Sequence, residues 1–282
     1  MKKILLIGGS GFIGKSLINY VKSNKLHSYK FINYSRSSNK NILKINKLPN
    51  IDFILYLIKS NNIKNSLKYF NHFEKLLIKS PKNIKIMYFS SGAVYGPRGK
   101  YKKFKETENV NFNKILKFKG YKKNYAKEKI ILERKFKEIS NKGYKISIVR
   151  GFTFYGKDIL ENNYLISDII NAVKQKKKLI IKNPYVIRSY MHSNDMSRWI
   201  LKIIKYSSDK CPIYNLGSEK ILNIEKFTNY LNKKYKSQIT IKKNKPKKID
   251  FYIPSVGLAK KKFKLKNTIN FNHAIKQLIK YK

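Results

Sequence analysis

A glycine-spaced loop near the start of the chain constrains the fold more than any other feature. The loop Gly8-Gly9-Ser10-Gly11-Phe12-Ile13-Gly14 directly follows the apolar run Ile4–Ile7 and precedes an amphipathic stretch. Glycines at this spacing allow a tight turn, bring the main chain close to a pyrophosphate and let the helix pack onto the sheet. The positive end of the helix dipole then faces the phosphates. The pattern predicts a strand–loop–helix unit that binds a dinucleotide, with cofactor contacts from Gly8, Gly11, Phe12, Ile13 and Gly14.

The same loop also satisfies the Walker pattern of P-loop nucleoside triphosphatases, because Lys15-Ser16 follows Gly14. Lysine is abundant throughout the chain, so its presence here carries little weight. Phe12 and Ile13 suit a helix that packs against a sheet, whereas a loop wrapped around phosphate needs open main-chain amides. No later strand-like run ends in an acidic residue that could hold Mg²⁺, since Asp52 stands at the start of its run. The context therefore argues against a P-loop enzyme.

Short apolar runs alternate with longer amphipathic stretches in the first half of the chain, as in a parallel sheet flanked by helices. The strand-like runs are Lys3–Ile7, Lys30–Tyr34, Ile42–Ile45, Phe53–Leu57, Ile84–Phe89 and Lys145–Val149. The helix-like stretches are Gly11–Ser23, Ile63–Lys79 and Tyr121–Ile139. We expect an α/β protein with a Rossmann-type doubly wound parallel sheet in residues 1–155, which also receives part of 186–206. A smaller α/β substrate-binding domain is expected in residues 156–282.

The formal net charge of +49 makes nucleic-acid binding an alternative to weigh. Only six of the 64 basic residues are arginine, the residue that reads bases and grips phosphate in a bidentate manner. The lysines are spread along the whole chain rather than gathered in one arm. Lys, Asn, Ile, Tyr and Phe are all abundant and have A/T-rich codons, so the composition fits an A/T-rich genome. We therefore expect no nucleic-acid partner.

The chain carries no signal that predicts export or membrane insertion. The apolar run Ile4–Ile7 is shorter than the core of a signal peptide, and no stretch approaches the ~20 apolar residues of a membrane span. A single cysteine, Cys211, excludes an internal disulfide and fits a reducing compartment. The four histidines are scattered, without the spacing of metal ligands. These features predict a cytoplasmic protein without a metal and without a membrane partner.

The end of the second strand-like run predicts which dinucleotide binds. A site for NAD usually carries an acidic residue about 20 residues after the glycines, which accepts hydrogen bonds from the ribose hydroxyls. Here the run ends in Tyr34-Ser35-Arg36-Ser37-Ser38. A guanidinium flanked by hydroxyl groups suits the 2′-phosphate on the adenosine ribose of NADP(H). Ser35 and Arg36 are therefore predicted to bind the cofactor and to favour NADP(H), with NAD(H) as the alternative.

Polar residues also follow the run Ile84–Phe89, and the carboxyl ends of central strands are where open α/β sheets bind ligands. Ser91 is the second of these residues. Further along, Tyr125 and Lys129 are spaced to lie on one face of a helix. A protonated lysine beside a phenol stabilises the phenolate, which would lower the pKa of Tyr125 from near ~10 and make it a usable acid or base.

The Tyr-x-x-x-Lys pattern is weak evidence on its own in a chain so rich in both residues. It begins at four positions: Tyr101, Tyr125, Tyr206 and Tyr230. Context selects Tyr125, because it opens an amphipathic stretch after the strand end at Ser91 and precedes Glu133 at the next helical repeat. We predict that Ser91, Tyr125 and Lys129 are the catalytic residues.

With these motifs in this order, the chain resembles the extended short-chain dehydrogenases/reductases that act on nucleotide sugars, the NAD-dependent epimerase/dehydratase group. The resemblance covers almost the whole chain. Four later segments add to it: Val149–Gly156, an arginine-bearing strand that ends in Tyr-Gly; Arg188–Met196, similar to Arg-x-Tyr-x-His-x-x-Asp; Tyr214–Ser218, similar to a strand of the second domain; and the Pro-containing Tyr252–Ser255.

The resemblance implies a role for each matching residue. Ser91 would hydrogen-bond the sugar oxygen at the reacting carbon, and Tyr125 would transfer the proton. Lys129 would hold the nicotinamide ribose. Arg188 would reach the substrate pyrophosphate, where a planar fork of donors suits phosphate; the alternative for Arg188 is an ion pair that tethers the second domain. Asn71 would match the structural asparagine of the family.

A nucleotide sugar is the implied substrate, and a two-fold homodimer paired through the helices near Ile63–Lys79 and Tyr121–Ile139 is the implied assembly. Family dehydratases follow the catalytic Ser or Thr with Asp-Glu, the acid and base that eliminate water. Gly92-Ala93 stands there in this chain, so we do not expect a 4,6-dehydratase. Thr153 and Asn46 replace a common Asn and a common adenine-side Asp.

Two enzymatic reactions use the same residues. A 4-ketoreductase reduces a sugar ketone with NADPH, and Arg36 favours this reaction, which would serve the synthesis of sugars for cell-surface polysaccharides. A 4-epimerase oxidises C4 and returns the hydride to the other face, with tightly bound NAD(P). A third alternative is a Rossmann protein that binds nucleic acid without catalysis, and the joint presence of Ser91, Tyr125 and Lys129 argues against it.

Overall fold

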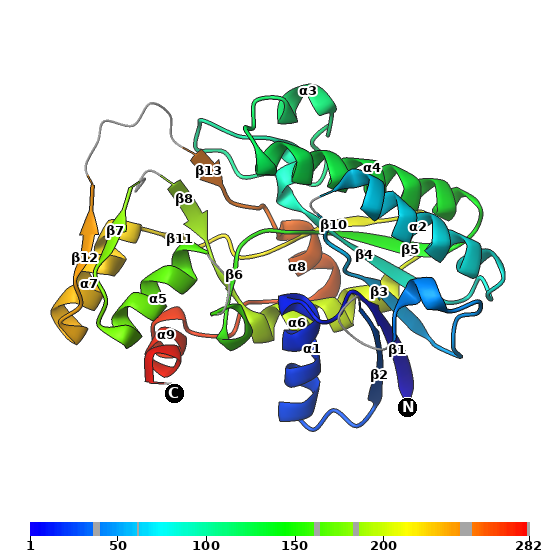
Figure 1. Ribbon diagram of the computed structural model, residues 1–282, viewed down its shortest axis with the longest axis horizontal. Coiled ribbons are helices and arrows are strands. Elements are labelled where there is room, and N and C mark those ends of the chain that lie inside the picture. The colour runs from blue at the N-terminus through cyan, green and yellow to red at the C-terminus, as the bar shows by residue number, and fades with distance from the viewer. Residues whose placement is uncertain (36–39, 61, 161–163, 183–185, 243–249, 281–282) are drawn as a thin grey trace.

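Six parallel strands form the central sheet, in the order β10-β5-β4-β3-β1-β2 (Figure 1). Their bounds are β1 (Lys2–Ile7), β2 (Tyr29–Tyr34), β3 (Phe53–Tyr56), β4 (Lys85–Ser91), β5 (Lys145–Gly151) and β10 (Ile213–Leu216). The computed structural model describes residues 1–35, 40–60, 62–160, 164–182, 186–242 and 250–280. The strand order reverses at β1, so the predicted Rossmann-type α/β fold is confirmed.

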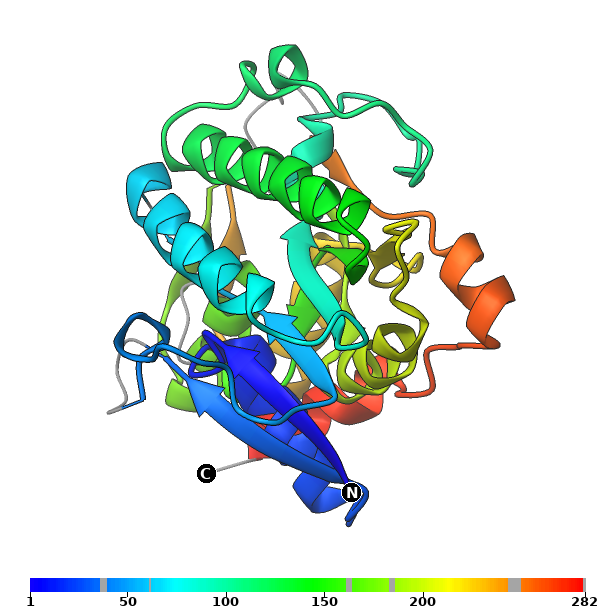
Figure 2. The ribbon, with the colours of Figure 1, turned by 90° about the vertical axis from the view of Figure 1, so that its right-hand side faces the viewer.

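Helices cover both faces of this sheet, which explains why its strands are apolar along their whole length. In β1, Ile4 and Leu6 pack into the core on one side, and Leu5 and Ile7 into the core on the other. Figure 2 shows the sheet between the two helical layers. The first side is covered by α1 (Phe12–Ser23) and α6 (Ser193–Ile203), and the second by α2 (Ile63–Ile78) and α4 (Tyr121–Asn141).

One predicted strand is wrong. Ile42–Lys44 forms a turn of 3₁₀ helix, η1, instead of the strand expected at Ile42–Ile45. The side chain of Asn41 starts this turn by accepting a hydrogen bond from the main-chain N–H of Leu43 at 3.0 Å. Ile42 is buried, as a strand residue would be, so hydropathy alone could not separate the two structures. The other predicted strands and helices are confirmed to within two residues at each end.

A smaller group of elements lies beside the sheet and has its own core, to which α5, α7 and α9 contribute (Figure 1). In it, β8 pairs antiparallel with β11 and parallel with β13, and β7 pairs with β12. The short strands β6 and β9 pair with each other. The remaining bounds are α3 (Phe112–Ile115), α5 (Leu165–Gln175), α7 (Ile224–Tyr235), α8 (Gly257–Phe263), α9 (Phe271–Lys280), β6 (Phe154–Tyr155), β7 (Leu179–Ile181), β8 (Val186–Ser189), β9 (Met191–His192), β11 (Ile221–Leu222), β12 (Ile239–Ile241) and β13 (Asp250–Tyr252).

Two segments from the second half of the chain belong with the large sheet. Helix α6 packs on α1, and β10 pairs with β5. The strand around Tyr214, expected in the second domain, is therefore an edge strand of the first. Buried Asp195 of α6 accepts hydrogen bonds from the main-chain N–H groups of Thr268 and Ile269, at 2.9 and 3.0 Å, and so fixes the segment before α9. The division at residue 155 remains a prediction.

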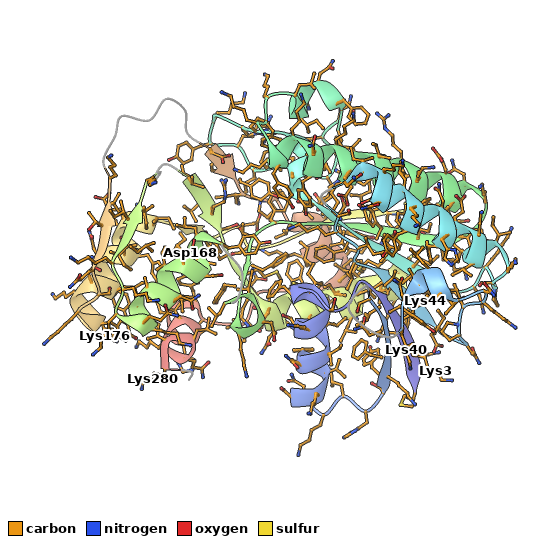
Figure 3. The ribbon with its side chains drawn as sticks, in the orientation of Figure 1. Lys3, Lys40, Lys44, Asp168, Lys176 and Lys280 are labelled. Atoms are coloured by element: carbon orange, nitrogen blue, oxygen red, sulfur yellow. The ribbon has the colours of Figure 1, made fainter. Side chains whose placement is uncertain are left out.

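Charged side chains project from elements at both ends of the molecule. In Figure 3, Lys3, Lys40 and Lys44 lie at one end, and Lys176 and Lys280 at the other. The labelled lysines thus lie at both ends of the molecule. Within the described residues, no helix combines the length and the hydropathy that crossing a membrane requires.

Candidate active site

The glycine loop has the close approaches that its sequence predicted. Gly8 has a φ of +89°, which side chains rarely permit. A Cβ at Gly14 would lie 2.2 Å from the carbonyl oxygen of Gly9, so only glycine lets α1 start this close to the loop. Gly11 is the N-cap of α1 and supplies no side-chain cap to the first amides of the helix. The helix therefore begins with main-chain donors of the kind that bind phosphate.

A cavity of about 280 Å³ lies against this loop, at the carboxyl ends of β1, β2 and β3. Gly8 and Gly11 line it, together with Ser35, Ile58 and Lys59. The side chains of Phe12 and Ile13, which are also predicted to contact the cofactor, pack against the apolar core. Arg36 lies outside the described residues. Asn41 also lines the cavity, whereas the Asn46 side chain is exposed.

The serine of the Walker-like pattern is engaged elsewhere. Ser16 is buried, and its hydroxyl donates a hydrogen bond to Asp158 Oδ2 at 2.8 Å. The side-chain amide of Asn19 donates to the other oxygen of the same carboxylate at 2.7 Å. Asp158 thus holds α1 in place from the turn after β6. Ser16 has a structural role, as expected for a dinucleotide loop rather than a P-loop.

Ser91 ends β4 and caps the 3₁₀ turn η2 (Gly92–Tyr95). Its Oγ accepts a hydrogen bond from the Ala93 N–H at 3.2 Å and lies 3.5 Å from the hydroxyl of Tyr252. The turn forms because the serine side chain satisfies the first free amide beyond the strand. Ser91 is therefore held at the carboxyl edge of the sheet, as predicted.

Tyr125 lies in the second turn of α4, and its phenol is close enough to the Ser91 side chain for Ser91 to act on its pKa. Burial raises the pKa of Tyr125 above its ordinary value, while the Ser91 side chain and the charge of Lys59 act to lower it. The net direction is opposite to the one predicted from the sequence, because desolvation of the phenolate is the largest effect. Two ammonium groups flank the ring: the Nζ of Lys59 lies 5.6 Å from the Tyr125 ring centroid and that of Lys129 5.7 Å.

Lys129 is buried beneath the Tyr125 ring, with its Nζ 5.7 Å from the ring centroid. The ammonium donates hydrogen bonds to the carbonyl oxygens of Ile58, at 3.4 Å, and Phe89, at 3.2 Å. Burial lowers the pKa of Lys129 to about 8, and the nearby charge of Glu128 opposes that shift. The helical spacing thus correctly predicted that Tyr125 and Lys129 share one face.

A buried network of polar side chains holds the carboxyl end of β4 in place. Glu133, one helical repeat after Lys129, accepts a hydrogen bond from Ser90 Oγ at 2.6 Å. The same carboxylate forms an ion pair with Arg150 of β5. Arg150 in turn lies over the ring of Tyr95, at 4.8 Å from its centroid. This network joins β4, β5 and α4 directly beside Ser91.

The structure does not bring every predicted residue to the site. Arg188 forms an ion pair with Asp250, with 2.6 Å between Nη2 and Oδ2, and its guanidinium lies 5.1 Å from the centroid of the Tyr252 ring. It therefore stands one side chain behind Ser91, and its ion pair joins two paired strands of the small sheet, β8 and β13. Asn71 lies on the exposed side of α2.

Two residues near Ser91 and Tyr125 were not predicted from the sequence: Tyr252 and Lys59. Tyr252 reaches Ser91 from β13, through a strand pairing that no local pattern predicts. Lys59 follows the carboxyl end of β3, where the rule applied to Ser91 would also have selected it. In a chain so rich in lysine, that position did not stand out.

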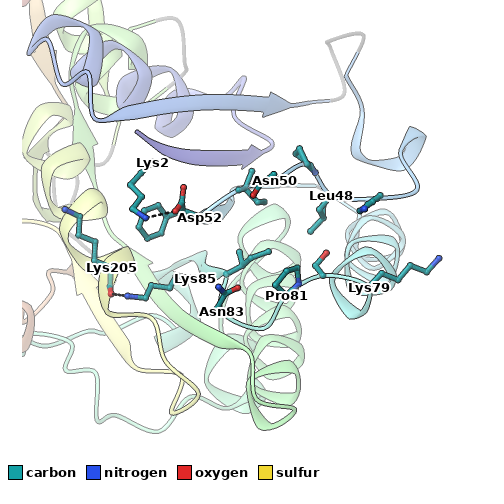
Figure 4. A pocket seen from close by; sticks show the side chains of 15 residues that line it. Lys2, Leu48, Asn50, Asp52, Lys79, Pro81, Asn83, Lys85 and Lys205 are labelled. Atoms are coloured by element: carbon teal, nitrogen blue, oxygen red, sulfur yellow. Dashed lines mark hydrogen bonds and ion pairs between the residues drawn. The ribbon is translucent and has the colours of Figure 1, made fainter.

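Two larger cavities lie away from these residues. One of about 840 Å³ lies at the opposite edge of the sheet, where β1 and β4 begin (Figure 4). Lys2 forms an ion pair with Asp52 there, and Lys85 donates to the carbonyl oxygen of Lys205. The other, of about 1070 Å³, lies between β11, α7 and α9. Neither contains a residue of the glycine loop, which lines the cavity at the carboxyl ends of β1, β2 and β3, where open α/β sheets bind ligands.

A protein-family model matches most of the chain. The model of the NAD dependent epimerase/dehydratase family matches residues 4–217, which include the glycine loop, Ser91, Tyr125 and Lys129. No curated protein matches the chain in sequence.

Solved structures share the fold over the whole chain. A dTDP-glucose 4,6-dehydratase from Bacillus anthracis, in complex with NAD, has a TM-score of 0.78 at 17% identity, covering 99% of this chain and 96% of its own. A UDP-glucose 4-epimerase from Thermotoga maritima has a TM-score of 0.75 at 17% identity, covering 99% and 98%. RMD from Pseudomonas aeruginosa, complexed with NADPH, has a TM-score of 0.74 at 15% identity, covering 99% and 98%. At sequence identities this low, the similarity to these structures shows only that the fold is shared. With the family match over most of its length, the chain belongs to the NAD dependent epimerase/dehydratase family.

Proposed function

We propose that the protein is an NADP(H)-dependent 4-ketoreductase that transfers a hydride to C4 of a nucleotide-diphosphate sugar, as a step in making sugars for cell-surface polysaccharides. The observation that carries this proposal is that Ser91 ends β4 and lies close enough to Tyr125 of α4 to act on its pKa, while Lys59 joins the two to the lining of the glycine-loop cavity, with its Nζ 5.6 Å from the Tyr125 ring centroid. A polar acid–base pair next to a dinucleotide loop suits the reduction of a carbonyl.

The residues around the loop fit a nicotinamide dinucleotide. The approach of Gly14 to Gly9 and the uncapped start of α1 favour a pyrophosphate. An ammonium has three donors, and Lys129 uses two of them on main-chain carbonyls, which leaves one for a ribose hydroxyl. The bound cofactor would supply the hydride.

The protein residues would then handle the proton. Ser91 would hydrogen-bond the oxygen at C4 of the sugar and hold it within reach of Tyr125. As C4 gains the hydride, the phenol of Tyr125 would give its proton to that oxygen, so the ketone becomes an alcohol and Tyr125 is left as a phenolate. The proton returns to Tyr125 from solvent between turnovers.

The neighbourhood of Gly92 supports a reaction other than dehydration. A Cβ at Gly92 would lie 2.6 Å from Phe152 Cζ and 2.7 Å from the Tyr252 hydroxyl. The rings of Phe152 and Tyr252 pack together, with centroids 4.6 Å apart. These two rings therefore occupy the space that an acid at position 92 would need. We infer that the chain is not a 4,6-dehydratase.

The preference for NADP(H) over NAD(H) is part of the proposal. Ser35 lines the loop cavity, and Arg36 follows it in sequence. Arg36→Glu should narrow or invert the preference by about 1–3 kcal/mol, the value of a hydrogen bond to a charged group. Titration with both cofactors measures this, and equal affinities in the unchanged protein would contradict it.

We further propose a two-fold homodimer paired through α2 and α4, and action in the cytoplasm on a soluble nucleotide sugar, without nucleic acid. Cys211, the single cysteine, is buried and free, as in a protein kept under reducing conditions. The spread of the lysines supports the absence of a nucleic-acid partner (Figure 3).

Incubation with a panel of nucleotide sugars and 4-keto nucleotide sugars, with and without NADPH, tests the reaction. Mass spectrometry follows the sugar, and absorbance follows the nicotinamide. One NADPH consumed for each ketone reduced is the expected result. Several turnovers without added cofactor would instead identify a 4-epimerase.

A further inference from the structure

Lys59 brings a second cation to the proposed acid–base centre. It follows β3, and its Nζ lies 5.4 Å from the ring centroid of Tyr121 and 5.6 Å from that of Tyr125. The two rings stack on each other one helical turn apart, with centroids 5.9 Å apart and an interplanar angle of 18°. Lys59 also lines the cavity of the glycine loop. The side chain therefore stands between the expected cofactor site and Tyr125.

The surroundings of Tyr125 include few charges. Ser91 from β4 and Tyr252 from β13 face its hydroxyl, and both are neutral near pH 7. Among the residues that the structure describes, the other ionisable groups nearby are Tyr121, Glu128 and Lys129 on α4, Tyr88 on β4, Lys59 after β3, and Tyr164, which acts on Lys59.

The two lysines differ in what they can do for Tyr125. Lys129 is buried and directs two of its donors to the carbonyl oxygens of Ile58 and Phe89. Lys59 is only partly covered, and its ammonium interacts with the side chain of Tyr121, 5.4 Å from the ring centroid. A cation near an aromatic ring attracts the neutral ring weakly and the phenolate strongly, because the phenolate carries a full negative charge.

We propose that Lys59 is a positioning residue for the proton transfer, which stabilises the phenolate of Tyr125 as the proton leaves. The inference rests on the proposed function, in which Tyr125 is the proton donor. Partial burial lowers the pKa of Lys59, but its interactions with Tyr121 and with Tyr164 and Tyr125 outweigh this effect, so the pKa is raised and the ammonium stays charged at neutral pH. The charge of Lys59 also acts to lower the pKa of Tyr125.

The test is the pH profile of kcat for ketone reduction, in the unchanged enzyme and in Lys59→Met, Lys59→Arg and Lys127→Met. Reduction needs the protonated phenol, so the fall in activity above pH 10 reports the pKa of Tyr125, whereas a fall near pH 8 reports Lys129. Loss of the Lys59 charge should move this alkaline limb up by about 1 pH unit and lower kcat at pH 7 about tenfold, since an opposite charge within ~4–6 Å shifts a pKa by about 1–3 units. Lys59→Arg keeps the charge and should restore both values. Lys127, exposed on α4, is the matched control and should change neither.

Three results would overturn the inference. In the first, the alkaline limb of the kcat profile does not move in Lys59→Met, and NADPH binding, measured by cofactor fluorescence, becomes weaker. Lys59 would then be a cofactor ligand instead. In the second, neither the alkaline limb nor the affinity for NADPH changes in Lys59→Met. Lys59 would then have no part in the reaction. In both cases Tyr125→Phe still loses turnover, so the proposed function stands. Full turnover in Tyr125→Phe would contradict the proposed function itself and the role of Lys59 with it.

Discussion

Glu133 of α4 and Arg150 of β5 form a bidentate ion pair inside the protein, with Arg150 Nε donating at 3.0 Å and Nη2 at 2.7 Å. Their side chains are only 5% and 3% exposed, so water cannot replace either partner. Removal of one partner from such a pair leaves a buried charge unpaired, which typically costs about 3–5 kcal/mol. We therefore expect Arg150→Met to lower the free energy of unfolding by about that amount.

Urea unfolding monitored by circular dichroism measures this effect. Glu138→Gln, on the exposed side of the same helix, is the control and should change the free energy of unfolding by less than ~0.5 kcal/mol. A small effect of Arg150→Met, similar to the control, would show that the ion pair does not hold α4 to the sheet.

Tyr125→Phe keeps the ring and removes the proton that must move with the hydride. Positioned acid–base catalysis contributes about 10²–10⁴-fold, so kcat should fall by that factor while cofactor affinity is nearly unchanged. Steady-state kinetics and fluorescence titration measure the two values. Phe at Tyr101, Tyr206 or Tyr230, all of them exposed, should leave turnover within a few-fold of normal. Loss of activity at one of those three, with full activity in Tyr125→Phe, would place the site elsewhere.

Lys129 should make the stability of the fold depend on pH in the alkaline range. Burial lowers its pKa from 10.5 to about 8 in the folded protein. Between these values the unfolded chain binds a proton that the folded chain does not, so stability rises with pH across this window. Relative to Lys129→Met, the unchanged protein should gain on the order of 2 kcal/mol between pH 7.5 and pH 10. Urea unfolding at several pH values measures the difference, and Lys127→Met should show no such trend. A difference that stays constant with pH would mean that Lys129 is not desolvated.

The affinity between the two subunits of the proposed dimer should rise as salt is added. The exposed faces of α2 and α4 carry one acid, Glu138, and a set of cations: Lys64, Lys68, Lys75, Lys122, Lys127, Arg134 and Lys137. A two-fold axis through these helices would set like charges opposite one another. Salt screens such repulsion, because the Debye length falls from about 30 Å at 0.01 M to about 10 Å at 0.1 M.

Sedimentation velocity at low and moderate ionic strength tests this expectation. The dimer should tighten as salt is added, and Lys68→Glu should strengthen it at low salt. A monomer under all conditions would contradict the dimer, and a dimer that weakens with salt would place the interface on another face.

The parts of the fold that the sequence predicted are those with a local signal. Buried parallel strands are apolar throughout, and a helix repeats its buried face every three or four residues, so β1, β4 and α4 could be read from short windows. The glycine loop was equally clear, since the close approach of Gly14 to Gly9 excludes any side chain. Ile42 was misread because a turn and a strand can bury the same side chain.

The remaining features depend on contacts between distant residues. Tyr252 reaches Ser91 across a separation of 161 positions, through the pairing of β13 with β8. The direction of the pKa shift of Tyr125 depends on burial by such neighbours, which no spacing rule measures. Arg188 was selected for its donors, but its place beside Asp250 follows from the register of the same strand pair.

The pairing of β10 with β5 has a consequence for protein synthesis. The first five strands are complete when the ribosome has added Gly151, yet the outer edge of β5 gains its partner only when Ile213–Leu216 emerges. At about 5–20 residues per second, the growing chain carries this unpaired edge for roughly 3–13 s. Exposed edges recruit strands from other chains, so this interval is when the nascent protein most needs the protection of a chaperone.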